Sequence, residues 1–213
     1  MPRWAKLVAV GMVLVALGAI AFAVFQPVQV LPRLRLAPGY ALVDQSGAQV
    51  TSEDGRGVIT LYAFVPPSCL DDCREVNTTL SEVRRRVASD VDLGPATFRV
   101  VTVLVDGAAT PELVAGAPGV AGTDWSWLIG TESQLENVVG LGFRRPVGAG
   151  DVSPSYAIVD GAGLIRGEYR YRTLADDADK LVRHVDVLGG ELRNRSPFTS
   201  FVYEAAHAFQ CYP

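Results

Sequence analysis

The chain begins with an apolar segment that is long enough to cross a lipid bilayer. From Leu7 to Phe25 it carries no charged residue. A helix of this length, at about 1.5 Å per residue, spans roughly 30 Å, which is the thickness of a membrane's hydrocarbon core. Arg3 and Lys6 precede the segment, and no basic residue follows it until Arg33. The positive-inside rule therefore predicts a cytoplasmic N-terminus.

This pattern predicts a single-pass protein of the cell membrane. Residues 1–6 are expected in the cytoplasm, residues 7–25 form the transmembrane anchor, and the rest lies on the periplasmic or extracytoplasmic side. The alternative is a cleaved signal peptide, because Ala21-Phe22-Ala23 resembles a cleavage site. The apolar run is longer than the hydrophobic region of a typical signal peptide, so a retained anchor in the lipid bilayer is the prediction.

Composition limits what the remaining chain can be. The protein has 213 residues and a formal net charge of −4, which leaves one domain large enough for its own core. This charge argues against nucleic acid as a partner. Thiols outside the membrane meet an oxidising compartment. The three cysteines therefore suggest a functional or disulfide pair and a leftover, Cys211.

Strand and helix patterns alternate after a proline-containing linker at residues 26–35. Residues 40–50 read as a hairpin with a turn around Gly47, and residues 57–65 as a central strand buried on both faces. The next segment is an amphipathic helix, with apolar residues four, three and four apart: Val76, Leu80, Val83 and Val87. The dense basic run inside it, residues 84–86, is interpreted as a solvated face.

The same alternation continues to the end of the domain. The expected elements are a second buried strand at 97–106, a helix start at Thr110-Pro111-Glu112, a short apolar stretch at 125–130, a helix at 131–142, a hairpin at 155–170, and a last helix at 176–190 ended by glycines. This order predicts an α/β domain over residues 36–192, with a thioredoxin-like mixed sheet flanked by helices. Residues 193–213 form an apolar C-terminal extension.

Two cysteines stand where the first buried strand gives way to a helix. Cys69 and Cys73 are spaced i to i+4, which suits both a disulfide and a pair of thiolate ligands for Cu(I). A helix N-terminus stabilises a thiolate, whereas Asp71 and Asp72 oppose it. Spacing and charge leave metal binding and redox chemistry open.

At this point the chain resembles the Sco/SenC family, membrane-anchored thioredoxin-fold factors associated with copper delivery to cytochrome c oxidase. The resemblance covers roughly residues 36–190. It rests on LVDQSGAQV, the strand leading into Cys69 and Cys73, VLVDGAATPELV, WSWLIGT and SYAIVDGAGLIRGEY. The resemblance implies a role in the respiratory electron-transport chain, with Cu(I) as the candidate metal ion bound by the two cysteines.

Two positions depart from the family pattern. Arg74 replaces the usual proline after the second cysteine, and Asp151 stands where the family has its third copper ligand, a histidine. The two histidines of the chain are His184, interpreted as a surface or structural residue, and His207 in the tail. A carboxylate is a hard ligand and a poor substitute for imidazole around Cu(I). The resemblance therefore implies a degenerate copper site.

Two functions remain open on this basis. One is an accessory subunit or assembly factor without chemistry of its own, bound to cytochrome c oxidase or to alternative complex III. The other is an active Cu(I) chaperone, or a thiol-disulfide reductant acting through Cys69 and Cys73, for the dinuclear copper centre of the oxidase. A peroxiredoxin is disfavoured because Pro66 and Leu70 stand where it needs a threonine or serine.

Overall fold

The computed structural model describes residues 2–25, 29–70, 74–117, 124–148, 152–170, 178–193 and 197–209. The chain divides into two compact units. One comprises Met1–Pro32 together with Asn194–Pro213, and the other is the domain Arg33–Arg193.

The first unit contains the two terminal helices. Helix α1 (Arg3–Phe25) includes a stretch, Arg3–Ala21, whose length and composition fit a membrane span and would equally fit a signal sequence. Its large apolar side chains are exposed to the surroundings, as a helix that faces lipid requires. Helix α7 (Pro197–Phe209) lies in the predicted apolar extension, and Ala206 on it is fully buried.

The domain is built on one mixed sheet of eight strands, in the order β1-β8-β7-β4-β5-β6-β2-β3. The strands are β1 (Arg35–Leu36), β2 (Ala41–Asp44), β3 (Gln49–Thr51), β4 (Val58–Val65), β5 (Thr97–Leu104), β6 (Trp125–Ile129), β7 (Ser155–Val159) and β8 (Leu164–Arg170). Strands β4, β5 and β6 are parallel. Strand β7 runs antiparallel to β4, and β8 runs antiparallel to β7 and therefore in the direction of β4. The predicted mixed sheet is therefore confirmed.

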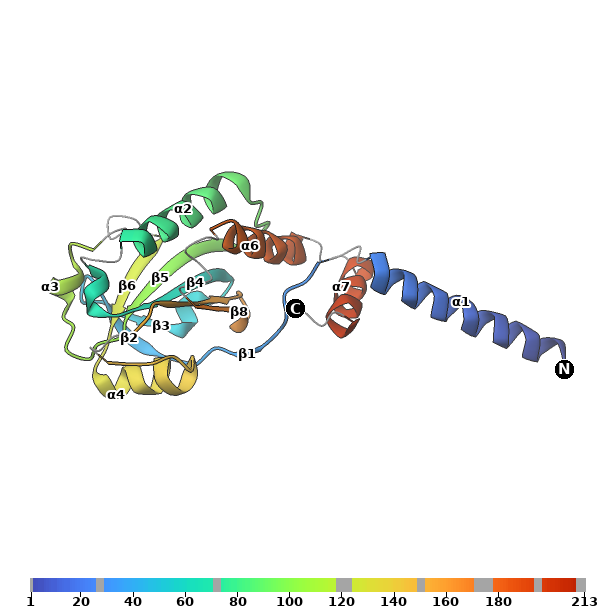
Figure 1. Ribbon diagram of the computed structural model, residues 1–213, viewed down its shortest axis with the longest axis horizontal. Helices are drawn as coiled ribbons and strands as arrows, with labels where there is room; N and C mark the ends of the chain where they lie inside the picture. Colours follow the sequence, from blue (N-terminus) through green and yellow to red (C-terminus); the bar gives the residue numbers. More distant parts are fainter. Residues whose placement is uncertain are drawn as a thin grey trace. The chain divides into compact units, whose positions relative to one another are not determined.

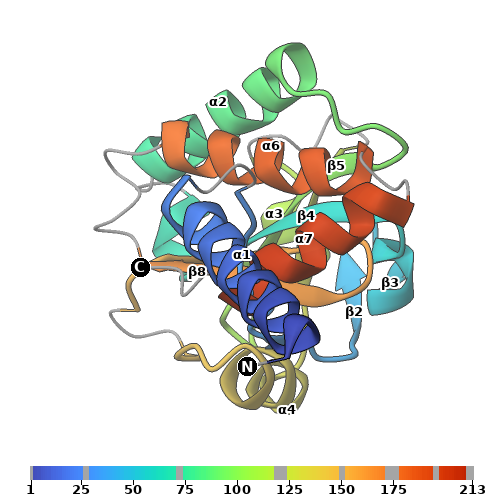
Figure 2. The same ribbon diagram turned by 90° about the vertical axis from the view of Figure 1, so that its right-hand side faces the viewer.

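Helices cover both faces of this sheet (Figure 1). Helices α2 (Arg74–Asp90) and α6 (Ala178–Arg193) pack side by side over one face, and α4 (Glu132–Leu135) with the turns that follow it lies under the other (Figure 2). All four apolar residues of the predicted amphipathic helix are buried on α2: Val76, Leu80, Val83 and Val87. The predicted strand that precedes it is buried along almost its whole length as β4.

The basic run on α2 is a set of ion pairs. Arg84 contacts Asp124 at 2.6 Å, Arg85 contacts Glu82 at 2.7 Å, and Arg86 contacts Asp179 on α6. These pairs lie at the surface and are partly exposed, which agrees with the interpretation of this run as a solvated face.

Two helix ends differ from the expectation. Helix α6 does not end at its glycines but continues through them to Arg193. Gly189 is needed there for packing, because a Cβ at that position would lie 2.7 Å from the backbone oxygen of Asp92. The predicted helix at 131–142 keeps α-helical geometry only through Leu135, and a π-helical stretch, η3 (Glu136–Gly142), follows. Its two glycines weaken the α-helical alternative.

A buried arginine joins the last hairpin to α6. The side chain of Arg166 is 4% exposed, and its guanidinium contacts Asp160 at 2.9 Å and Glu191 at 2.8 Å. Both carboxylates are themselves largely buried. Removing one member of such a group leaves an uncompensated buried charge, so these contacts specify where α6 docks on the sheet.

A glycine on β8 makes room for a buried tyrosine. A Cβ at Gly167 would collide with the hydroxyl of Tyr169 and lie 2.7 Å from its Cζ. We therefore expect Gly167→Ala to lower the free energy of unfolding by about 1–3 kcal/mol through overpacking. Gly116→Ala is the matched control, because its new methyl group meets no atom within 4 Å. Urea unfolding of the two variants should separate them; equal midpoints would contradict this account of Gly167.

Candidate functional site

The candidate site lies at the carboxyl end of the parallel strands. The Val105 amide donates to the carbonyl of Val65 at 2.9 Å, and the Gly148 amide donates to the carbonyl of Val105 at 2.8 Å. Ser155 pairs with Phe64 in the β4–β7 ladder. The ends of β4 and β5 and the start of β7 therefore meet at one edge of the sheet, which is where α/β sheets commonly place their sites.

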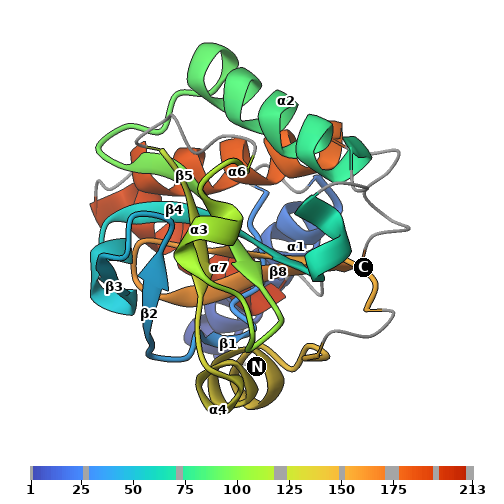
Figure 3. The same ribbon diagram turned by 90° about the vertical axis from the view of Figure 1, so that its left-hand side faces the viewer.

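Cys69 occupies a short turn directly after β4. This turn, η2 (Pro67–Leu70), lies at the same edge as α3 (Pro111–Val114), which follows β5 (Figure 3). The Cys69 amide donates to the carbonyl of Pro66 at 3.0 Å, and the side chain is only 1% exposed. Pro66-Pro67 ends the strand because proline has no amide hydrogen to continue the ladder.

Cys69 is part of a disulfide. The other two cysteines of the chain, Cys73 and Cys211, both lie outside the described residues. The spacing of Cys69 and Cys73 lies within the range that a disulfide bridges, so Cys73 is the partner that the sequence favours. A buried, oxidised sulfur at this edge is consistent with a redox pair and does not require metal.

Asp151 also lies outside the described residues, but both flanks of its loop are fixed. Gly148 is hydrogen-bonded to Val105, and Ser155 pairs with Phe64. The chain on either side of residue 151 is thus attached to the strands that lead to Cys69 and to α3. The alignment of Asp151 with the position of the family's histidine stays a prediction.

The one histidine of the domain is engaged elsewhere. His184 on α6 is 4% exposed, and its Nδ1 lies 2.5 Å from the hydroxyl of Tyr169 on β8. The interpretation of His184 as a structural residue fits this buried contact. The second histidine, His207, lies on α7 in the other unit.

The polar groups near Cys69 are held in local turns. The carboxylate of Asp106, just after β5, accepts a hydrogen bond from the Ala108 amide at 3.1 Å. The Asn77 side chain approaches the Cys69 carbonyl at 3.5 Å. Glu112 on α3 has its pKa lowered by hydrogen bonds from its own backbone amide and from the Thr110 hydroxyl. These hydrogen bonds fix the orientation of the three polar side chains at this edge of the sheet.

A complete metal centre is not visible in the described part of the domain. Within it, no three side chains of histidine, cysteine, aspartate or glutamate gather closely enough to hold a metal ion. Cys69 is the one predicted ligand inside these ranges, while Cys73 and Asp151 are outside them. A soft two-sulfur site for Cu(I) remains compatible with the position of Cys69.

The domain's fold is shared with solved Sco proteins. A SCO1/SenC family lipoprotein from Bacillus anthracis superimposes with a TM-score of 0.63 at 14% identity, covering 76% of this chain and 98% of that one. BsSco, described as a member of the Sco family of cytochrome c oxidase assembly proteins with a disulfide switch, superimposes with a TM-score of 0.62 at 17% identity. The match covers 76% of this chain and 98% of that one. Yeast Sco1 with copper bound superimposes with a TM-score of 0.58 at 16% identity, covering 78% of this chain and 93% of that one.

No model of a protein family and no curated protein matches the sequence. At sequence identities below 25%, these similarities establish the fold alone. They confirm the predicted thioredoxin-like architecture. The predicted resemblance to Sco/SenC proteins is likewise confirmed at the level of fold. Copper, cytochrome c oxidase and a disulfide switch belong to the neighbours' descriptions and reach this chain only as proposals.

Proposed function

We propose that this chain is a membrane-anchored, Sco/SenC-like protein of the respiratory chain with a degenerate copper site. It acts as an accessory subunit or assembly factor bound to a respiratory membrane complex, either cytochrome c oxidase or alternative complex III. The observation that carries the proposal is the position of Cys69. It lies in the turn that directly follows the central strand of a Sco-like fold, in a domain whose one histidine is hydrogen-bonded to Tyr169.

The ligand chemistry supports a degenerate site. Cu(I) prefers thiolate, thioether and imidazole ligands. The two methionines, Met1 and Met12, belong to the N-terminal segment, and His184 is buried in its contact with β8. The domain can offer Cu(I) the sulfurs of Cys69 and Cys73, with the hard carboxylate of Asp151 in the third place. Such a site holds copper less firmly than one with two sulfurs and an imidazole.

A second function is favoured by the oxidised state of Cys69. A reduced Cys69–Cys73 pair could reduce a disulfide in a partner by two thiol-disulfide exchanges. The first exchange forms a mixed disulfide and releases one partner thiol; the second closes the Cys69 disulfide and releases the other. One disulfide breaks and one forms, so the electrons balance. We assign no other enzymatic activity to the chain.

The proposal includes a membrane topology, which rests on the apolar segment within α1 and on the basic residues before it. The proposal places residues 7–25 in the bilayer, the N-terminus in the cytoplasm and the Sco-like domain on the outer side. Alkaline phosphatase fused after Pro213 should then be active, because that enzyme needs disulfides that form only outside the cytoplasm. An inactive fusion that is made in full would reverse this orientation.

Co-purification tests the proposed function. The full chain, tagged at its C-terminus and solubilised from native membranes in mild detergent, should migrate with the subunits of one respiratory complex in near-stoichiometric amount. A chain of residues 1–35 carrying the same tag is the matched control for non-specific membrane carry-over. Recovery of the full chain as a free monomer, with no respiratory subunit above the control, would refute the accessory role.

A further inference from the structure

Exposed leucines gather on one part of the domain. Among the residues that the structure describes there, four large apolar side chains are exposed: Leu34, Leu36, Leu113 and Leu141. Leu113 lies on α3, which shares an edge of the sheet with Cys69. The other three are 46%, 71% and 70% exposed and belong to β1 and to the end of η3. Single exposed leucines are ordinary, whereas a group of them marks an interaction surface.

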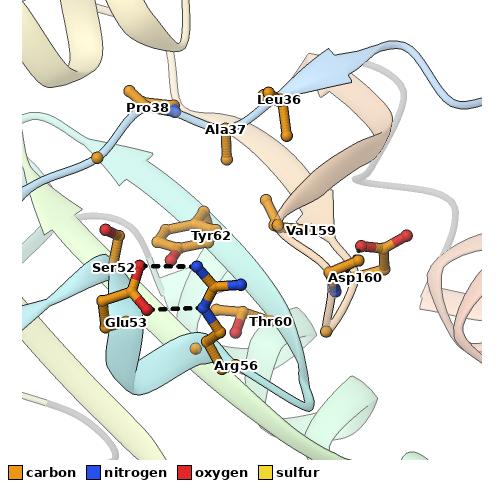
Figure 4. Close-up of a pocket in the computed structure, with 15 residues that line it drawn as sticks. Leu36, Ala37, Pro38, Ser52, Glu53, Arg56, Thr60, Tyr62, Val159 and Asp160 are labelled. Atoms are coloured by element: carbon orange, nitrogen blue, oxygen red, sulfur yellow. Dashed lines mark hydrogen bonds and ion pairs between the residues drawn. The ribbon is translucent and has the colours of Figure 1, made fainter.

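The segments that carry these three leucines lie side by side. Strand β1 forms one edge of the sheet, and Figure 4 shows Leu36 and Pro38 on the same stretch of chain. The Nη2 of Arg35 donates to the carbonyl of Phe143 at 3.1 Å. A Cβ at Gly142 would lie 2.5 Å from the side chain of Pro38. Residues 33–38 and 141–145 therefore form one surface, which we call the β1 corner.

The β1 corner has an excess of positive charge. Its two segments contain four arginines and no acidic residue: Arg33, Arg35, Arg144 and Arg145. The carboxylate of Glu168 on β8 lies 2.6 Å from Arg35 and 3.8 Å from Arg145, so it serves both. The carboxylate of Glu136 lies one turn earlier on η3, where a Cβ at Gly140 would lie 2.8 Å from it. Four arginines thus stand against two glutamates, in a chain whose net charge is −4.

Arg144 is the arginine of this surface that is open to a ligand. Its side chain is exposed and forms no ion pair with any residue in the described part of the chain. Its φ of 56° lies in the left-handed region that favours glycine. A glycine would adopt this turn with less strain, so the fold does not require an arginine here. The guanidinium is a geometry suited to binding a phosphate group.

The chain itself holds the β1 corner close to the proposed anchor. Leu34 follows the last residue of α1, Phe25, by nine positions. Nine residues reach at most about 30 Å when fully extended. If α1 spans the bilayer, exposed leucines and an unpaired arginine are thus kept within this distance of lipid headgroups. Anionic lipids attract basic residues near their surface, and apolar side chains insert at the boundary between headgroups and acyl chains.

We propose that the β1 corner rests on the surface of the membrane that holds α1. Leu34, Leu36 and Leu141 enter the boundary of the acyl chains, and Arg144 binds the phosphate of an anionic lipid. This inference rests on the proposed membrane anchor. Leu36 pairs with Leu164 at the start of β8, which runs in the direction of β4, whereas Cys69 follows the end of β4. The edge with Cys69 therefore stays clear of the lipid and open to a partner.

Tryptophan quenching in lipid discs tests the anchor separately from the docking. The full chain is reconstituted in discs of phosphatidylglycerol and phosphatidylcholine that carry brominated acyl chains. Trp125 and Trp127 are buried, while Trp4 on α1 is exposed. Quenching of the unchanged chain therefore reports Trp4 near the headgroups. Its absence would contradict the anchor and, with it, the docking.

Added tryptophans test the docking itself. In Leu36→Trp and Leu141→Trp the additional emission should be quenched at least about threefold more strongly than in Leu113→Trp, because only the first two positions enter the lipid boundary. Leu113→Trp is the matched control, an exposed leucine at the edge with Cys69. Equal quenching of the three, with Trp4 quenched, would overturn the proposal and leave the anchor intact. Loss of co-purifying respiratory subunits in these variants, without lipid quenching, would assign the β1 corner to a protein partner instead.

The charge of Arg144 is tested in the Leu141→Trp chain. Arg144→Gln should shift the equilibrium between docked and undocked domain about fivefold towards the undocked state, and discs of phosphatidylcholine alone should also weaken docking. Arg85→Gln is the control, because this arginine pairs with Glu82 on α2; its quenching should not change. Quenching that is the same in both lipids and in Arg144→Gln would contradict the binding of an anionic lipid.

Discussion

Asp151→His is expected to raise the affinity of the chain for copper by at least about tenfold. The change supplies an imidazole at the position that we propose to be equivalent to the third ligand of Sco/SenC proteins, and imidazole suits copper far better than a carboxylate does. One well-placed ligand contributes more than the 1.4 kcal/mol that corresponds to a tenfold change. Competition with a chromophoric chelator, under anaerobic conditions for Cu(I), measures the gain.

Two further variants make this test specific. Asp151→Asn removes the charge without adding a ligand, so it should not bind copper more tightly than the unchanged chain. Asp151→His combined with Cys69→Ser and Cys73→Ser should lose the gain. If Asp151→His binds copper no better than Asp151→Asn, the proposed equivalence of position 151 with the family's histidine is wrong.

A second large effect is expected in thiol reactivity. In a chain with Cys73→Ser and Cys211→Ser, Cys69 should react with a polar disulfide reagent at least about 100-fold more slowly than after unfolding in urea. The reason is that its side chain is 1% exposed, so the reagent must wait for a local opening of the structure.

The reciprocal chain, with Cys69→Ser and Cys211→Ser, makes the comparison. If the reduced pair reduces a partner's disulfide, Cys73 must supply the attacking thiolate, since Cys69 is covered. Cys73 should therefore show much less protection than Cys69 does. Equal protection of the two thiols would exclude this order of attack, and fast labelling of native Cys69 would contradict its buried position.

Local patterns in the sequence predict much of the fold. Buried strands read as continuous apolar runs, as in β4, and the four-three-four spacing from Val76 to Val87 matches the buried face of α2. The hairpin turn at Gly47 also follows, because its φ of 83° is a conformation that favours glycine. In each case a short stretch of chain contains the whole signal.

Contacts between distant residues explain what could not be predicted. Gly189 read as the end of α6, but its role is to let the loop at Asp92 approach, and nothing near Gly189 in the sequence reveals that loop. The pairing of Arg166 with Glu191 and the contact of Arg99 with Thr60 likewise depend on how elements pack. Such polar contacts leave no periodic pattern.

The candidate site could be predicted only in part, because only some of its residues lie on elements with strong local patterns. Cys69 could be placed at a strand-helix junction because the strand and the helix are both strong local signals. The contact of His184 with Tyr169 could not be predicted from the sequence. The one local sign is the Gly167-x-Tyr169 spacing on β8, which indicates that this tyrosine folds back over its own strand.

Anaerobic Cu(I) titration of the unchanged chain tests the central claim most directly. A chain with Cys69→Ser and Cys73→Ser is titrated alongside it against the same competing chelator. The account predicts that the unchanged chain gives up Cu(I) to a chelator of moderate strength, because it lacks the third soft ligand. Retention of one equivalent of Cu(I) that disappears in the double variant would show a working copper site and contradict the degenerate one.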